Sequence, residues 1–281
     1  MIRIFDAHIH CSERPDDQLI TYARQNGLEY TLDELLQMMD EYSVASGLLL
    51  SPPLKHGSFL PNKEILKLCS RSRGRLHPIF TARPSKNYVA ECIEEAKQNR
   101  DCLKGFKILL GYYKVYPDDP VLDPLYDYAE SEDLPVMFHT GDTATKSGSL
   151  AHSHPLTLDP LANRRPALKI GACHFGNPWI EEVAELIYKH TNVFADISGL
   201  CAGGSGTKSG NKYSYQYLEM LGRKLSDAIY YIGSAERILF GTDYPVETYS
   251  TALDLVGRLK VDEDDKQKIL FLNAQEVFGI P

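Results

Sequence analysis

The sequence lacks the features that mark membrane-spanning and disulfide-bonded proteins. No apolar run approaches the ~20 residues that a helix needs to cross a bilayer. The six cysteines are scattered and include no Cys-x-x-Cys pair. A strand is predicted at the very N-terminus, which leaves no room for a signal peptide. We therefore expect a cytoplasmic protein whose thiols are reduced.

The sequence also lacks an excess of positive charge. Its 30 lysines and arginines are outnumbered by 38 aspartates and glutamates, which gives a net charge of −8. This balance argues against nucleic acid or an anionic membrane as the main partner. No linker-like stretch divides the chain, so we expect residues 1–281 to form one domain that acts on a small-molecule substrate. The chain could also form a homo-oligomer.

What the sequence does contain is a regular alternation of short apolar segments with helical patterns. Such an alternation predicts right-handed βαβ units and a parallel sheet. Eight repeats in roughly 250 residues are what a closed (β/α)₈ barrel, or TIM barrel, needs, and an open doubly wound sheet is the alternative. The predicted strands cover residues 4–10, 45–51, 76–82, 103–110, 135–140, 169–175, 193–198 and 238–242.

The first predicted strand reads IFDAHIH and contains a His-x-His pair. Strand alternation places Asp6, His8 and His10 on one face and the apolar residues, among them Phe5 and Ala7, on the other. Two imidazoles one pleat apart can both reach a cation at roughly 2.0–2.1 Å. The motif is weak by itself, because two histidines on a polar strand face can simply be solvated.

Further candidate ligands stand at the ends of other predicted strands. In a (β/α)₈ barrel the active site lies at the carboxyl ends of the strands. Four of the nine histidines fall at the ends of three predicted strands, namely His8, His10, His139 and His174. Asp243 follows the last predicted strand. These positions predict a metal site at that end of the barrel.

Six segments, taken together in their order and spacing, resemble the amidohydrolase-related (amidohydrolase 2) family of the amidohydrolase superfamily. That family contains metal-dependent TIM-barrel hydrolases and decarboxylases, and the similarity spans essentially the whole chain. The segments are FDAHIH (5–10), GFKILL (105–110), PVMFHTG (135–141), CHFG (173–176), GTDYP (241–245) and NAQEVFG (273–279).

The resemblance implies that His8, His10, His139 and Asp243 are metal ligands. It also implies that Asp243 handles the proton of a metal-bound water, and that His174 is either a ligand of a second metal or a catalytic acid or base. Three imidazoles, a carboxylate and water make an open site for Zn²⁺, with Mn²⁺ or another divalent cation as the alternative.

Such a cation would activate water for attack on a substrate. The leading expectation is therefore hydrolysis of a C–N or C–O bond (amide or lactone) in a small, carboxylated substrate. Non-oxidative decarboxylation is the alternative that the same ligand set supports in the family. A barrel that binds metal or ligand without catalysis is a third hypothesis, although it would need neither His174 nor Asp243 for proton transfer.

Lys107 has three interpretations. Strand alternation turns Phe106 and Ile108 outward and Lys107 inward. It could be carboxylated and bridge two metals, stay an ammonium that binds a substrate carboxylate, or form a structural ion pair. We predict the charged ammonium and a site with one metal, with Asp243 or Asp196 offsetting its charge. Whether Asp196 belongs to the site or to the scaffold stays open.

Two further residues are candidates for substrate binding. Arg83, near the end of the third predicted strand, could bind a substrate carboxylate with both of its terminal nitrogens. His154 lies in the loop after the fifth predicted strand, and solvation is its alternative. The Gly- and Ser-rich segment 200–213 is predicted to be a lid over the barrel mouth.

Overall fold

Short parallel strands form the centre of the protein in a computed structural model that describes residues 3–201 and 214–280. Among these residues, one sheet has the order β1-β2-β3 and a second has the order β4-β5-β6-β7-β8-β9. The strands are β1 (Ile4–His10), β2 (Val44–Leu50), β3 (Leu76–Pro78), β4 (Phe80–Thr81), β5 (Phe106–Ile108), β6 (Val136–Phe138), β7 (Ile170–Ala172), β8 (Val193–Asp196) and β9 (Ile238–Leu239).

Backbone hydrogen bonds join the two sheets at both of their edges. Between β3 and β4, the N–H of Ile79 donates to the carbonyl of Leu49 at 3.0 Å. These two strands are therefore the halves of the single strand predicted at 76–82. At the other edge, the N–H of Ala7 donates to the carbonyl of Phe240 at 2.9 Å. The ring is thus continuous, and the predicted (β/α)₈ barrel is confirmed.

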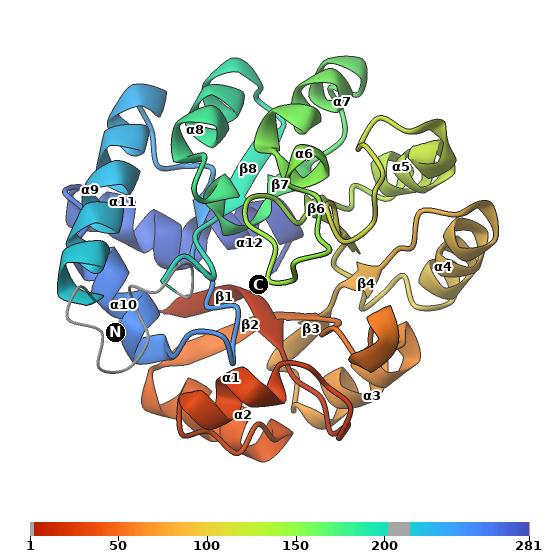
Figure 1. Cartoon of the computed structure of the whole chain (residues 1–281), viewed down its shortest axis with the longest axis horizontal. Coiled ribbons are helices and arrows are strands. Elements are labelled where there is room, and N and C mark those ends of the chain that lie inside the picture. Colours follow the sequence, from red (N-terminus) through yellow and green to blue (C-terminus); the bar gives the residue numbers. More distant parts are fainter. Residues whose placement is uncertain (1–2, 202–213, 281) are drawn as a thin grey trace.

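Helices surround the strands as an outer ring (Figure 1). They follow the strands in the alternation that the sequence predicts, although the last predicted helix is broken by a π-helical turn at Lys268–Leu272. The helices are α1 (Ile20–Gln25), α2 (Leu32–Glu41), α3 (Asn62–Arg71), α4 (Lys86–Gln98), α5 (Asp123–Ser131), α6 (Leu150–Ser153), α7 (Asp159–Arg164), α8 (Ile180–Lys189), α9 (Ser214–Ile232), α10 (Tyr249–Gly257), α11 (Glu263–Gln267) and α12 (Asn273–Phe278). None of these helices is long and apolar enough to pass through a lipid bilayer.

Two layers of apolar side chains hold the barrel together. The larger layer lies between the strands and the helices, and the smaller one fills the barrel interior. At the end of the interior opposite the carboxyl ends of the strands, the ring of Phe278 on α12 lies 6.4 Å from that of Phe5 and 6.0 Å from that of Phe194. Because α12 closes this end, the polar strand ends on the opposite side are the ones left to form a cavity.

Strand β1 departs from simple alternation, which corrects one prediction. Phe5 and Ala7 lie in the interior layer, whereas Asp6 bonds to Thr242. His8 also lines the interior cavity, because the pairing of β1 with β2 shifts register between Asp6 and Ile9. Such a bulge turns the following side chains to the other face. His8 and His10 therefore share a face, as predicted, but Asp6 does not join them.

The proposed lid can be placed only at its start. Leu200 and Cys201 are buried, and residues 202–213 lie outside the part of the chain that the structure describes.

Candidate metal centre

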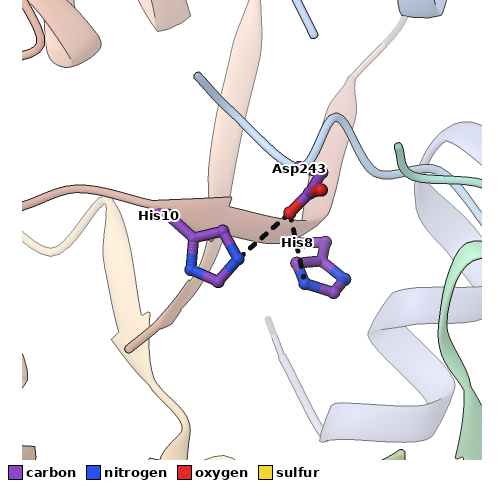
Figure 2. Close-up of side chains that lie close together, drawn as sticks. All are labelled: His8, His10 and Asp243. Atoms are coloured by element: carbon purple, nitrogen blue, oxygen red, sulfur yellow. Dashed lines mark ion pairs between the residues drawn. The ribbon is translucent and has the colours of Figure 1, made fainter. Parts of the chain in front are cut away.

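Three of the predicted ligands converge at the carboxyl end of the barrel. His8 and His10 come from β1, and Asp243 follows β9, the strand beside it (Figure 2). The Nε2 of His10 lies 3.0 Å from Oδ1 of Asp243, and the Nε2 of His8 lies 3.6 Å from the same oxygen. One ligand atom from each residue falls within 4.8 Å of the others, which is a spacing that could hold a metal ion.

The second nitrogen of each ring is already engaged. His10 Nδ1 lies 3.0 Å from the carbonyl oxygen of Leu50, and His8 Nδ1 lies 3.2 Å from Oδ2 of Asp196. A carbonyl or an ionised carboxylate can only accept, so both Nδ1 atoms carry the proton. In a neutral imidazole the Nε2 then keeps its lone pair, as a metal-ligating ring requires. The donor set therefore fits a divalent cation.

The backbone at this end of the barrel adopts conformations that residues other than glycine rarely take. Asp243 has φ of 58° and His174 has φ of 60°, both in the left-handed region. Gly199 has φ of 67°, and a Cβ added there would meet Asp243 Oδ2 and His174 Nδ1, each at 3.0 Å. Strained residues of this kind cluster at functional sites. Here they turn two polar side chains toward one cavity.

His139 and His174 form a pair of their own. His174 Nε2 lies 3.1 Å from His139 Nδ1, and His139 Nε2 lies 2.9 Å from the carbonyl oxygen of Asp142. Both rings line the same cavity as His8 and His10. His139 is thus placed beside the three converging donors but bonds to Asp142, so its role as a fourth ligand remains a prediction.

Burial favours the neutral form of His8, His139 and His174, and neighbouring histidines keep the Asp243 carboxylate ionised. Burial, reinforced by the charge of Lys107, lowers the pKa of His8 to about 3. Burial likewise lowers the pKa values of His139 and His174. Burial alone would raise the pKa of Asp243, but His10, His8 and His174 together hold it well below its usual value. These are the protonation states that a cation needs in its ligands.

The donors open into a cavity of about 190 Å³. Lys107 points into it while Phe106 and Ile108 pack outward, as predicted. Lys107 Nζ donates to Sγ of Cys173 at 2.7 Å. A thiol whose pKa is raised by burial thus stands where a carboxylate was expected. The apolar part of the lining comes from Leu19, Pro53, Phe59, Leu109, Ala144 and Val246.

Two predicted substrate contacts lie away from the cavity. The Arg83 guanidinium lies 5.0 Å above the ring of Tyr88. The ring of His154 caps the short 3₁₀ helix Pro155–Leu158 and lies 4.6 Å from the ring of Trp179. Neither residue lines the cavity that the described residues enclose. Both come from loops, whose paths strand-end positions do not fix.

Sequence reasoning passed over several polar residues in the cavity wall, among them Ser51. Ser51 lines the cavity immediately after β2, and its buried hydroxyl has no hydrogen-bond partner among the described residues. It stands at a strand end, so the rule that selected the histidines would also have selected it. Buried hydroxyls are rarely left unpaired in the absence of a ligand or water.

Two curated proteins are similar in sequence, and both are named gamma-resorcylate decarboxylase. The one from Polaromonas sp. strain JS666 is 27% identical over 191 residues, which cover 56% of this chain and about half, 54%, of that protein. The one from Rhodococcus jostii RHA1 is 22% identical over 302 aligned positions, covering 88% of this chain and 87% of that protein.

Solved structures with the same fold include an uncharacterised TIM-barrel protein from Bordetella bronchiseptica. It superposes with a TM-score of 0.75 at 18% identity and covers 99% of both chains. A dihydroxybenzoic acid decarboxylase from Polaromonas sp. JS666, solved with manganese and 2-nitroresorcinol, gives a TM-score of 0.66 at 18% identity, covering 100% of this chain and 98% of that one.

These comparisons correct the expected reaction. Hydrolysis of a C–N or C–O bond was the leading expectation from the sequence, yet both curated relatives are named as decarboxylases. The prediction of a hydrolase is therefore wrong, and the decarboxylation alternative is favoured. The prediction failed because the resemblance implied the same ligand set for both reactions, so the ligands could not discriminate between them. The amidohydrolase family profile matches residues 5–280, nearly the whole length, so this chain belongs to the amidohydrolase family of enzymes.

Proposed function

We propose that this protein is a metal-dependent, non-oxidative decarboxylase of a small hydroxylated aromatic acid. The observation that carries the proposal is the pairing of three convergent metal donors with the Lys107 cation in one cavity. The names of the two curated relatives support the reaction and the substrate class. Residues 1–281 would act as one domain, with a small molecule as the partner.

His8, His10 and Asp243 would hold the cation, with His139 as a fourth ligand. The fit rests on the lone pairs of the two Nε2 atoms and on the low pKa of Asp243. A divalent cation bound there would supply positive charge that attracts and polarises substrate oxygens. We propose one ion, Mn²⁺ or Zn²⁺. The manganese in the Polaromonas decarboxylase structure favours the first of these.

The substrate would lie with its carboxylate toward Lys107 and its ring against the apolar wall. A buried ammonium that donates only to a thiol, among the described residues, can form a stronger charge-assisted bond to a carboxylate. Leu109 and Phe59 would contact the ring from the apolar side of the cavity. The Ser51 hydroxyl is uncharged, so it suits a neutral phenolic hydroxyl better than the carboxylate.

The reaction requires one proton and releases carbon dioxide. A proton adds to the ring carbon that bears the carboxylate, the bond from that carbon to the carboxylate then breaks, and its electron pair restores the aromatic ring. Asp243 would deliver the proton through Oδ2, because Oδ1 is the oxygen that lies against the Nε2 atoms of His8 and His10. His174 would exchange the proton with solvent.

A panel of hydroxylated benzoic acids tests the proposal. Purified protein is stripped of metal with a chelator, reconstituted with Mn²⁺ or Zn²⁺, and assayed for carbon dioxide and for the decarboxylated phenol. We expect release from an acid with a hydroxyl beside the carboxylate, such as 2,6-dihydroxybenzoate, and loss of activity on chelation. Failure of every acid with either metal would refute the decarboxylase assignment.

A further inference from the structure

Asp196, at the end of β8, is the centre of a buried hydrogen-bond cluster behind the metal donors. Its Oδ1 accepts from the backbone N–H groups of His174 at 3.0 Å and Ser198 at 3.1 Å, and from the Ser198 hydroxyl at 2.5 Å. Its Oδ2 faces Nδ1 of His8 at 3.2 Å. Three N–H and O–H donors thus converge on one oxygen of Asp196, and hydrogen bonds of this kind favour the ionised form of a carboxyl group.

We propose that Asp196 is a positioning residue that fixes His8 in the tautomer with the proton on Nδ1, leaving the Nε2 lone pair for the cation. The inference rests on the proposed function only in taking His8 as a metal ligand. It gives Asp196 a role that the sequence left open between the site and the scaffold.

Counting protons around His8 leads to this assignment. The ionised Asp196 can only accept, and its Oδ1 already receives three donors. The single hydroxyl proton of Ser198 goes to Oδ1, so the lone pairs of Ser198 Oγ, 3.1 Å from His8 Nδ1, can only accept there as well. Both neighbours of His8 Nδ1 are acceptors. Nδ1 must therefore be the donor, and Nε2 is the unprotonated nitrogen.

The same hydrogen bonds occupy the atoms that a second cation behind the first would need. His8, His174 and Asp196 also have ligand atoms within 4.8 Å of one another. The Ser198 hydroxyl, however, lies among them, 3.0 Å from His174 Nδ1. His174 Nδ1 also faces the Ser198 carbonyl oxygen at 3.1 Å and so carries a proton too. The cluster orients histidines rather than binding metal, which agrees with one ion per chain.

Asp196→Asn is the decisive variant, because it keeps the shape of the side chain and replaces one accepting carboxylate oxygen with a donating NH₂ group. The asparagine oxygen would stay where two backbone N–H groups point, which places its NH₂ group opposite His8 Nδ1. His8 would then have to accept there and carry its proton on Nε2. We expect Mn²⁺ affinity, measured by chelator competition, to fall about 10- to 100-fold. The ¹⁵N spectrum of the metal-free variant should show His8 protonated on Nε2.

Asp159→Asn is the matched control. Asp159 Oδ1 lies 2.7 Å from Nε2 of His190, in a second Asp–His pair outside the cavity. We expect this variant to bind Mn²⁺ as tightly as the unaltered protein. A merely structural role for Asp196 would instead lower the melting temperature of the Asn variant without moving the His8 proton.

Three results would overturn the inference. One is an Asp196→Asn protein that binds Mn²⁺ with unchanged affinity. Another is an unaltered, metal-free protein whose His8 carries its proton on Nε2, a measurement that needs no variant to fold. The third is two Mn²⁺ ions per chain in the unaltered protein. None of these readouts uses decarboxylation, so failure to find a decarboxylated product would refute the proposed function and leave this inference standing.

Discussion

Two groups of polar residues share the cavity, and they differ in how completely they are hydrogen-bonded. The proposed metal-binding group consists of His8, His10 and Asp243, and the Nδ1 atoms of its two histidines are anchored to Asp196 and to the Leu50 carbonyl. The proposed substrate-binding group, Lys107 and Ser51, is poorly paired among the described residues. Lys107 donates only to a thiol, and the Ser51 hydroxyl has no partner.

This difference indicates two kinds of binding. A cation requires ligands that are already oriented and in the right protonation state, so the surrounding residues of the proposed metal-binding group fix both. A substrate must arrive and leave, and buried polar groups that are satisfied only when it is bound provide specificity for it. Mutations in the first group should therefore abolish the site, whereas those in the second should change which acids it accepts.

The largest expected effect comes from removing Asp243. Asp243→Ala deletes both a ligand and the proposed proton donor, and general acid catalysis alone contributes about 10²- to 10⁴-fold. We expect activity to fall by at least that factor and metal content to fall with it. Metal analysis alongside carbon dioxide release checks both. A variant that keeps its metal and half of its rate would place Asp243 outside the chemistry.

Lys107→Met should have the next largest effect. Methionine keeps most of the buried volume but removes the cation. Loss of a hydrogen bond to a charged group costs about 1.5–3 kcal/mol, or roughly 10- to 150-fold in kcat/KM. Metal content should stay unchanged, because Lys107 is not one of the proposed ligands. Mass spectrometry of the intact unaltered protein provides a second check, since a carboxylated Lys107 bridging two ions would contradict this account.

Ser51→Ala should have a smaller and selective effect. A neutral hydrogen bond contributes about 0.5–1.5 kcal/mol, so we expect kcat/KM for 2,6-dihydroxybenzoate to fall roughly 2- to 12-fold. An analogue lacking one of the two hydroxyls should be affected less. Thr81→Val is the control, because the Thr81 hydroxyl is also buried without a partner among the described residues but lies outside the cavity. Equal losses on both substrates would mean that Ser51 contacts the carboxylate instead.

Arg83→Ala should have the smallest effect. Its guanidinium lies over Tyr88 and does not line the cavity. We expect kcat/KM to change by less than about 2-fold, as is usual for substitutions away from a site. A large rise in KM would instead bring Arg83 into substrate binding and revive its assignment from sequence.

Most of the fold follows from sequence periodicity, and the exceptions have local causes. Apolar segments of strand length, separated by helical patterns, specify the alternation and hence the barrel. They do not reveal the break at Ile79 between β3 and β4, where pairing passes from one sheet to the other. Nor do they reveal the register shift between Asp6 and Ile9, because a bulge is set by the neighbouring strand rather than by the residues that form it.

The site was predictable as far as strand ends determine it. His8, His10, His139, His174, Asp243 and Lys107 all line the cavity, as their positions in a barrel require. Arg83 and His154 do not, because loop geometry depends on contacts that no local pattern encodes. The type of reaction could not be predicted from the sequence for a different reason. The resemblance implied one ligand set for both hydrolysis and decarboxylation, so the predicted ligands did not select one of the two reactions.

One isotope experiment tests the central claim most directly. The Mn²⁺-reconstituted protein is incubated in D₂O with 2,6-dihydroxybenzoate that carries ¹³C in its carboxyl group. The account predicts ¹³C-labelled carbon dioxide and 1,3-dihydroxybenzene with one deuterium at the carbon that lost the carboxyl group. Label that stays attached to the aromatic ring, under conditions where the protein holds its metal, would contradict it.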